Sequence, residues 1–148
     1  MQRVLKWIGE SGFWRFVGKI HVRFYRWTGG LLGKRAGKLD HLLLTTTGRK
    51  SGVSRTVPLT YMPDGDRFIL VASNGGADRH PAWWLNLERT PHAIVEVGRE
   101  RVDVTAIRAD QKEHARLWPM LKSYNPFYGQ YEQITDRSIP VVILQRDR

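Results

Sequence analysis

The chain has 148 residues, of which 41% are hydrophobic, and its formal net charge is +10 at pH 7. This length and composition are typical of one globular domain with a sizeable core. The absence of cysteine excludes disulfides and thiolate chemistry. Apolar runs are far shorter than the roughly 20 residues that a membrane span needs, and the charged N-terminus does not resemble a secretory signal. We therefore expect a cytoplasmic protein.

Residues 1–38 form a basic segment that holds nine Lys or Arg residues, one acidic residue and seven aromatic residues. At about 100° per residue, the apolar side chains between Phe13 and Trp27 share one face of a helix. The opposite face is cationic and carries Arg15, Lys19, Arg23 and Arg26. This pattern favours peripheral contact with an anionic membrane, at the inner face of the cell membrane. Packing on the body or on a second subunit is the alternative, so a monomer and a homodimer both stay open.

Residues 39–148 read as a body of short strands. Extended segments are expected at 40–47, 53–62, 67–73, 93–97, 101–108 and 139–144, since each is apolar or β-branched and bounded by turn residues. Helices are expected at 81–88, from a capping box at Asp110 and Glu113 to about Lys122, and, helical or irregular, over 124–133. The first three strands should form an antiparallel meander. The pattern predicts a mainly β (α+β) fold: a six-stranded barrel with two or three short helices.

The link between the first two strands, Gly48–Gly52, is a candidate anion site. It places Arg49, Lys50 and Ser51 between two glycines, and Arg55 follows. Backbone N–H groups beside cationic side chains suit a phosphate or a carboxylate. The spacing does not match a Walker loop. A solvated hairpin with a charged tip is the alternative.

A second glycine-rich turn, Ser73–Gly76, follows the third strand and would let backbone approach a flat ligand closely. Trp83 and Trp84 come soon after it, either to wall a planar cofactor or to pack in the core. Further along the chain, three phenols that could line a pocket stand about one helical turn apart: Tyr124, Tyr128 and Tyr131.

No metal site and no hydrolytic site is predicted. The five histidines lack H-x-x-x-H spacing on an expected helix, and there is no G-x-S-x-G elbow. If the protein is an enzyme, its reactive atom should therefore belong to a bound cofactor that the protein binds and orients.

Several of these segments together resemble the deazaflavin-dependent nitroreductase family. The similarity covers roughly Leu42 to Leu144 and is carried, in order, by Leu43–Gly52, Arg55, Pro58–Leu59, Ala72–Ser73, Gly75–Gly76, Pro81–Leu87, Thr135–Arg137 and Ile139–Pro140. The resemblance implies a split β-barrel, FMN-binding-like, that binds coenzyme F420, an 8-hydroxy-5-deazaflavin with a phosphate and an oligoglutamate tail. It also implies hydride transfer from the reduced coenzyme to quinones, nitroaromatics or α,β-unsaturated lactones such as coumarins and aflatoxins.

The resemblance assigns roles residue by residue. The phosphate and tail would be held by Arg49, Lys50, Ser51 and Arg55. The ring would be bordered by Pro58, Ala72, Ser73, Gly75 and Gly76, with Trp83, Trp84 and Asn86 beside it. The catalytic groups would be Tyr128 and Tyr131 on the substrate side and Ser73 at the ring. Three positions depart from the best-known nitroreductase pattern and leave the substrate open: Thr60, Asn74 and Asn125.

Two other functions compete with this interpretation. One is a split-barrel protein that binds FMN or only carries a cofactor. The other is a basic nucleic-acid-binding module, which the N-terminal charge and aromatics would allow. Because those residues lie on one helix without a recognised binding motif, no nucleic-acid partner is expected. The expected partner is a lipophilic small-molecule electron acceptor.

Overall fold

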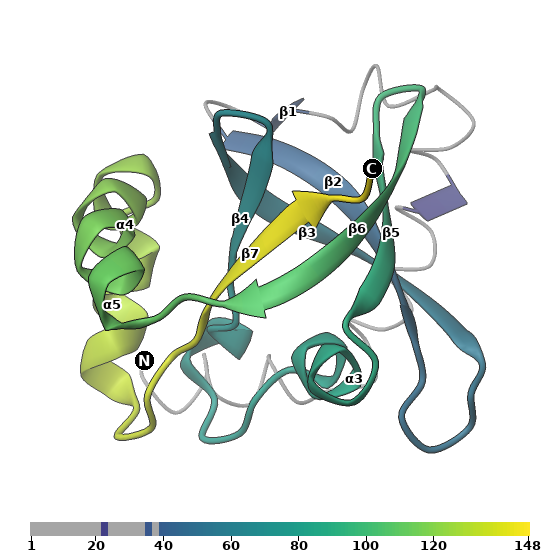
Figure 1. Cartoon of the computed structure of the whole chain (residues 1–148). Coiled ribbons are helices and arrows are strands. Elements are labelled where there is room, and N and C mark those ends of the chain that lie inside the picture. The colour runs from purple at the N-terminus through teal and green to yellow at the C-terminus, as the bar shows by residue number, and fades with distance from the viewer. Residues whose placement is uncertain (1–21, 24–34, 37–38) are drawn as a thin grey trace.

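The computed structural model describes residues 22–23, 35–36 and 39–148. Its elements are β1 (Arg35–Ala36), β2 (Leu39–Thr47), β3 (Ser54–Asp64), β4 (Arg67–Val71), the 3-10 turn η1 (Asn74–Gly76), α3 (Ala82–Arg89), β5 (His92–Val97), β6 (Glu100–Arg108), α4 (Gln111–Tyr124), α5 (Phe127–Ile134) and β7 (Val141–Arg146). The strands form one sheet in the order β1-β2-β3-β4-β7-β6-β5. Figure 1 shows this sheet curling round, with α4 and α5 packed on one side.

The sheet closes into a barrel because β2 is paired along both of its edges. One edge pairs with β3, and the other pairs with β1 and with β5, where Leu44 lies opposite Val95. All pairs are antiparallel. The six strands β2 to β7 therefore make the expected six-stranded barrel, and β2, β3 and β4 make the expected meander.

The strands β4 and β7 are apolar on both faces because each face is covered. Phe68 and Leu70 of β4 and Val142 and Leu144 of β7 point into the barrel core. Their neighbours along the strands pack outward against α4 and α5, in a second core that comprises Met62, Ile69, Val71, Leu117, Trp118, Leu121, Tyr128, Ile139, Val141 and Ile143. The period of two residues in a strand produces this division.

The helices begin as their sequences predict. The Asp110 side chain accepts a hydrogen bond of 2.8 Å from the backbone N–H of Glu113, which caps α4. Pro81 precedes α3, where its missing N–H costs nothing.

Two local predictions need correction. The strand expected over 67–73 ends at Val71, because Asn74 and the glycines that follow it adopt left-handed backbone conformations that turn the chain. The two-residue strand β1 was not predicted. Arg35 and Ala36, within segment 1–38, are extended because they pair with β2.

The amphipathic helix expected near the N-terminus lies largely outside the described residues. Val22 and Arg23 are helical. Val22 is buried against Leu43 of β2, whereas Arg23 is exposed. Within the part of the chain that the structure describes, no helix is long and apolar enough to cross a membrane.

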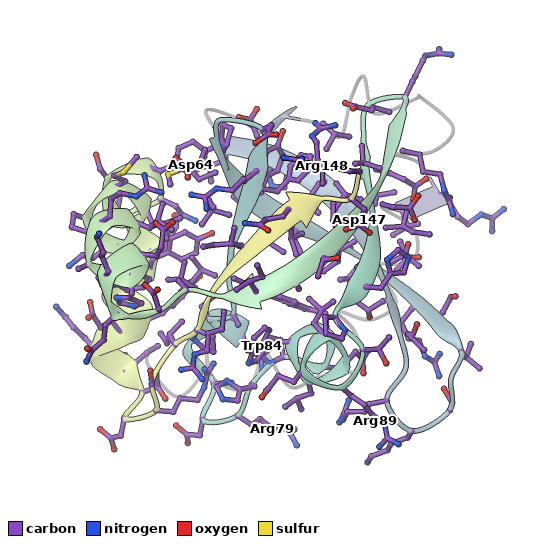
Figure 2. The ribbon with its side chains drawn as sticks, viewed as in Figure 1. Asp64, Arg79, Trp84, Arg89, Asp147 and Arg148 are labelled. Atoms are coloured by element: carbon purple, nitrogen blue, oxygen red, sulfur yellow. The ribbon has the colours of Figure 1, made fainter. Side chains whose placement is uncertain are left out.

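An ion-pair network ties the β3–β4 turn to α4, at the end of the barrel where Figure 2 labels Asp64. Asp64 accepts hydrogen bonds from Arg67 and Arg116, and Glu113 accepts from the same two arginines. The hydrogen bonds from Arg116 and Arg67 lower the pKa of Asp64 from 3.8 to about 2. The network therefore favours the ionised carboxylate of Asp64.

Replacing Asp64→Asn should lower the free energy of unfolding at pH 7 by about 1 kcal/mol, a value reduced by solvent screening. Because the pKa of Asp64 is lower in the folded state, its contribution is complete above pH 4 and disappears as the pH falls through 2. Urea unfolding at pH 7 and pH 2 measures the loss of unfolding free energy and its dependence on pH. Asp66→Asn, on the same turn, is the control. Equal losses for the two variants at pH 7, or an unchanged Asp64→Asn deficit at pH 2, would contradict this role.

Candidate active site

Most of the residues singled out from the sequence lie on the two glycine-rich turns and α3, at the other end of the barrel. Figure 1 shows the β2–β3 link, η1, α3 and the connection between α5 and β7 at this end. Trp84 and the neighbouring Arg79 and Arg89 lie here too, whereas Asp64, Asp147 and Arg148 lie at the opposite end (Figure 2).

The Gly48–Gly52 link is folded tightly on itself. The N–H of Gly48 donates to the carbonyl of Val53 at 2.8 Å, and the N–H of Gly52 donates to the carbonyl of Gly48 at 2.8 Å. Ser51 Oγ accepts from the N–H of Val53 at 3.2 Å. The Lys50, Ser51 and Arg55 side chains are exposed. The link therefore presents cations on a preformed backbone.

Asn86 of α3 anchors this link. Its side chain is buried, and its Nδ2 donates to Thr46 Oγ1 at 3.0 Å. Its Oδ1 accepts from the backbone N–H of Arg49 at 3.1 Å and from Arg49 Nη1 at 3.3 Å. Both ends of the amide are thus bonded to protein. The resemblance places Asn86 beside the ring, and the structure adds a function in holding Arg49.

The turn after β4 has three consecutive residues with positive φ: Asn74 at 48°, Gly75 at 62° and Gly76 at 80°. Glycine and asparagine adopt this conformation at least cost. A Cβ added to Gly75 would meet nothing within 4 Å, so one side of the turn is open. A Cβ added to Gly76 would collide with Ile134, which packs directly against the turn. The Asn74 side chain donates to the carbonyl of Arg79 at 3.1 Å.

Arg137 holds the same turn from behind, and the site residues expected from the sequence did not include it. Its guanidinium donates to the carbonyls of Ala72, Ser73 and Ala77 and to Nδ1 of His80. The only sequence signal was the Thr135–Arg137 motif in the family resemblance. Nothing in that motif shows which backbone groups the guanidinium contacts.

The surroundings of His80 favour its neutral form. Partial burial and the nearby Arg137 and Arg108 cations lower the pKa of His80 below 6.5, and Glu88 opposes them. Since a guanidinium can only donate, His80 Nδ1 accepts the bond and the ring proton resides on Nε2.

The two tyrosines predicted for the substrate side lie on α5. Tyr128 is buried, and burial raises the pKa of Tyr128 to about 12, partly offset by a hydrogen bond with Asn125. Tyr131 is half-buried, burial raises the pKa of its hydroxyl, and its ring lies beside Gly76. The Phe127 and Tyr131 rings stack at 6.3 Å. Tyr131 is therefore the phenol next to the glycine turn.

Tyr124 has another function. Its hydroxyl accepts from the N–H of Asp40 at 2.8 Å and donates to Asp40 Oδ2 at 3.1 Å, which joins the end of α4 to β2.

Trp83 and Trp84 belong to the barrel core, as does Ala72. Figure 2 shows Trp84 lying inside the body, between α3 and the turn after β4. Among the described residues, Trp84 Nε1 is buried without a hydrogen-bond partner. Trp83 and Trp84 therefore pack in the core, which was one of the two expectations for them. The Nε1–H group of Trp84 stays unpaired at this end of the barrel.

Pro58 and Thr60 lie on β3, opposite Leu43 and His41 of β2. They alternate with residues that pack in the barrel, so they face outward. Thr60 Oγ1 and His41 Nε2 form a hydrogen bond of 3.2 Å.

Gly76→Ala should destabilise the protein by about 2–4 kcal/mol, because it combines a strained φ with a collision against Ile134. Gly75→Ala should cost only about 1 kcal/mol, since its Cβ meets open space. Thermal or urea unfolding measures both. In a double-mutant cycle, Ile134→Ala should reduce the cost of Gly76→Ala, whereas additive costs would contradict the collision.

Comparison with known proteins identifies the family. The model of the F420H2-dependent quinone reductases matches residues 17–146. A protein of Mycobacterium tuberculosis described as an F420H2-dependent quinone reductase is 42% identical over 132 residues, covering 86% of this chain and 89% of that protein. A solved F420-H2 dependent reductase is 37% identical, covers 71% of this chain and 93% of its own, and has a TM-score of 0.65.

A second solved chain, described as a domain-swapped dimer, is 32% identical, covers 85% of this chain and 96% of its own, and has a TM-score of 0.68. These similarities confirm the split barrel and the expected reductase with coenzyme F420 as its cofactor, in preference to an FMN carrier or a nucleic-acid-binding module. The chain belongs to the F420H2-dependent quinone reductase family.

Proposed function

We propose that this protein reduces quinones by hydride transfer from reduced coenzyme F420, at the end of the barrel that carries the two anchored turns. The observation that supports this most is their juxtaposition. The cationic link and the open glycine turn are held on either side of α3, the first by Asn86 and the second by Arg137. A ligand with an anionic tail and a flat ring matches that arrangement.

The residues present fit the coenzyme. The exposed side chains of Lys50, Ser51 and Arg55 offer charged and neutral donors for its phosphate and carboxylates. The open side of Gly75 leaves room for a ring, which a Cβ would restrict. We assign the phosphate and tail to the link, and the ring to the turn at Ala72, Ser73, Gly75 and Gly76, with Pro58 as a further border.

When bound, the reduced coenzyme supplies the hydride. The protein contributes position and electrostatics, since hydride transfer requires the reacting atoms about 3–3.5 Å apart and aligned. Peptide N–H groups near Ser73 would stabilise negative charge on the ring. The link would hold the tail so that the ring stays at the turn.

Tyr131 is the proposed proton donor toward the reduced acceptor. Burial raises the pKa of Tyr131 and holds that of Tyr128 at about 12, so both phenols keep their protons at neutral pH. Tyr131 lies beside Gly76, whereas Tyr128 is more buried and bonded to Asn125. We infer that Tyr131 acts on the acceptor oxygen and that Tyr128 supports the pocket wall.

Nitroaromatics and α,β-unsaturated lactones are the second class of acceptors in this proposal, because both offer an electron-poor atom to a hydride. Thr60 departs from the best-known nitroreductase pattern, in which a larger tyrosine stands after the Pro-Leu pair, and the Thr60 hydroxyl is hydrogen-bonded to His41. A smaller side chain favours flat acceptors of varied shape. The basic segment 1–38 would bring the enzyme to anionic membranes and lipophilic quinones, and a homodimer agrees with the domain-swapped relative.

The direct test is a coenzyme titration followed by oxidation of the reduced coenzyme with menadione, and with a coumarin as the second acceptor. Binding and faster oxidation by menadione are expected. A protein that neither binds the coenzyme nor accelerates its oxidation would overturn the proposal, and menadione turnover without coumarin turnover would restrict it to quinones.

Combining Lys50→Ala and Arg55→Ala should weaken coenzyme binding about 10-fold or more, because charge-assisted hydrogen bonds to the phosphate are lost. Stability should change little, as both side chains are exposed. Fluorescence titration of the coenzyme and thermal unfolding measure the two effects. Lys112→Ala with Arg101→Ala, which removes two exposed cations elsewhere, is the matched control. Similar affinity losses for both pairs would indicate a nonspecific charge effect.

Tyr131→Phe should lower kcat with menadione by about 100-fold, the smaller end of the range for general acids, with coenzyme affinity unchanged. Tyr128→Phe should lower it less, since its hydroxyl is engaged with Asn125. Steady-state kinetics at saturating coenzyme separate these effects. A Tyr131→Phe enzyme with the original kcat would show that the proton comes from elsewhere.

A further inference from the structure

Arg137 makes an unusual set of contacts at this end of the barrel. Arg137 lies between α5 and β7 in the sequence, and its side chain contacts the segment 72–80. Nε donates to the carbonyl of Ala77 at 2.8 Å, one terminal nitrogen donates to the carbonyls of Ala72 at 3.2 Å and Ser73 at 2.8 Å, and the other donates to His80 Nδ1 at 3.0 Å. One planar guanidinium thus joins four residues of the segment 72–80.

These hydrogen bonds go to carbonyls and an imidazole rather than to carboxylates. A guanidinium stays protonated in proteins, although partial burial lowers the pKa of Arg137 and nearby Asp78 opposes this. Three carbonyl dipoles therefore point at a cation that is shielded from water on one side. This arrangement makes the orientation of the peptide planes costly to change.

The orientation of those carbonyls fixes the opposite edge of each peptide. In a trans peptide the C=O and the following N–H point in opposite directions. Because the carbonyls of Ala72 and Ser73 face Arg137, the N–H groups of Ser73 and Asn74 face away from it. The cation also polarises both peptides, which strengthens them as donors.

We propose that Arg137 is a positioning residue for the coenzyme: it holds the 72–77 turn and presents the Ser73 and Asn74 N–H groups to the electron-rich edge of the deazaflavin ring. This inference rests on the proposed function and extends it. Arg137 acts through the turn and touches neither the coenzyme nor the acceptor. The left-handed turn with its open glycine keeps its shape through this contact.

His80 completes the arrangement in its neutral form. The charged groups facing it are Arg137 and Arg108, with Glu88 opposing them, and Asp78 lies near Arg137. Protonation of His80 would remove the acceptor for Arg137 and place two cations together. Coenzyme affinity should therefore fall as the pH drops through the pKa of His80, which is below 6.5.

The test compares Arg137 with Arg146, which is a matched control near the opposite end of the barrel. Arg146 also donates to a carbonyl, that of Asp66 at 3.1 Å, and it packs over the Phe68 ring. Coenzyme affinity and thermal stability are measured for Arg→Gln and Arg→Lys at each position. Arg137→Gln should weaken binding about 10-fold or more, and Arg137→Lys by less, because lysine keeps the charge without the planar fork. The Arg146 variants should lose stability only.

The binding measurements distinguish a failure of the proposed function from a failure of the inference about Arg137. A wild-type protein that does not bind the coenzyme overturns the proposed function and this inference together. A wild type that binds, with Arg137 variants that bind equally well, overturns this inference alone. Affinity losses of the same size at Arg146 would show a general effect of stability and would also overturn it.

His80 variants provide a readout that a loss of stability would not produce, and they serve if Arg137→Gln does not fold. His80→Asn keeps an acceptor near the position of Nδ1, whereas His80→Gln places its polar atoms near that of Nε2. His80→Asn should retain affinity and keep it at pH values below the pKa of His80, where the wild type loses it. His80→Gln should bind weakly at every pH. Variants that both follow the pH profile of the wild type would contradict the role of His80 and the presentation of the turn by Arg137.

Discussion

The antiparallel pairing that closes the barrel is the constraint on which the functional end depends. β5 pairs with the same edge of β2 that carries β1, and Thr45 near the end of β2 lies opposite Ile94 near the start of β5. The helix that precedes β5 must therefore lie beside the end of β2. This placement lets Asn86 of α3 reach Thr46 and Arg49, and it brings the cationic link against the helix.

The same rule positions the glycine turn. β4 pairs with β7, with Val71 opposite Val141, so the residues after β4 meet the residues before β7. The N–H of Ala72 donates to the carbonyl of Pro140 at 2.9 Å, and Arg137 comes three residues before Pro140. Two strand pairings thus generate the anchors of both turns. The site is an outcome of sheet topology, with the chemistry added by the residues that follow each strand end.

Much of this could be predicted from the sequence because local signals agreed with the final packing. Strand periodicity, turn glycines and the cap at Asp110 are local features, and they gave the barrel strands and α4 within a few residues. Arg137 could not be predicted as an anchor, since its partners are 57 to 65 residues away in the chain. The same holds for Asn86, whose partners lie 37 and 40 residues earlier. The strand β1 could not be predicted because two residues are too few to show the alternating pattern of a strand. The family resemblance supplied the coenzyme, which no spacing in the chain could identify.

We propose that the coenzyme binds at the end of the barrel formed by the β2–β3 link and the turn after β4. Amide chemical shifts in an NMR titration with coenzyme F420 test this most directly. Large shifts are expected for the glycine amides at 48, 52, 75 and 76, and little change is expected at Gly65 in the β3–β4 turn of the opposite end. Shifts concentrated around Gly65, or a saturated complex in which the four glycines do not move, would contradict it.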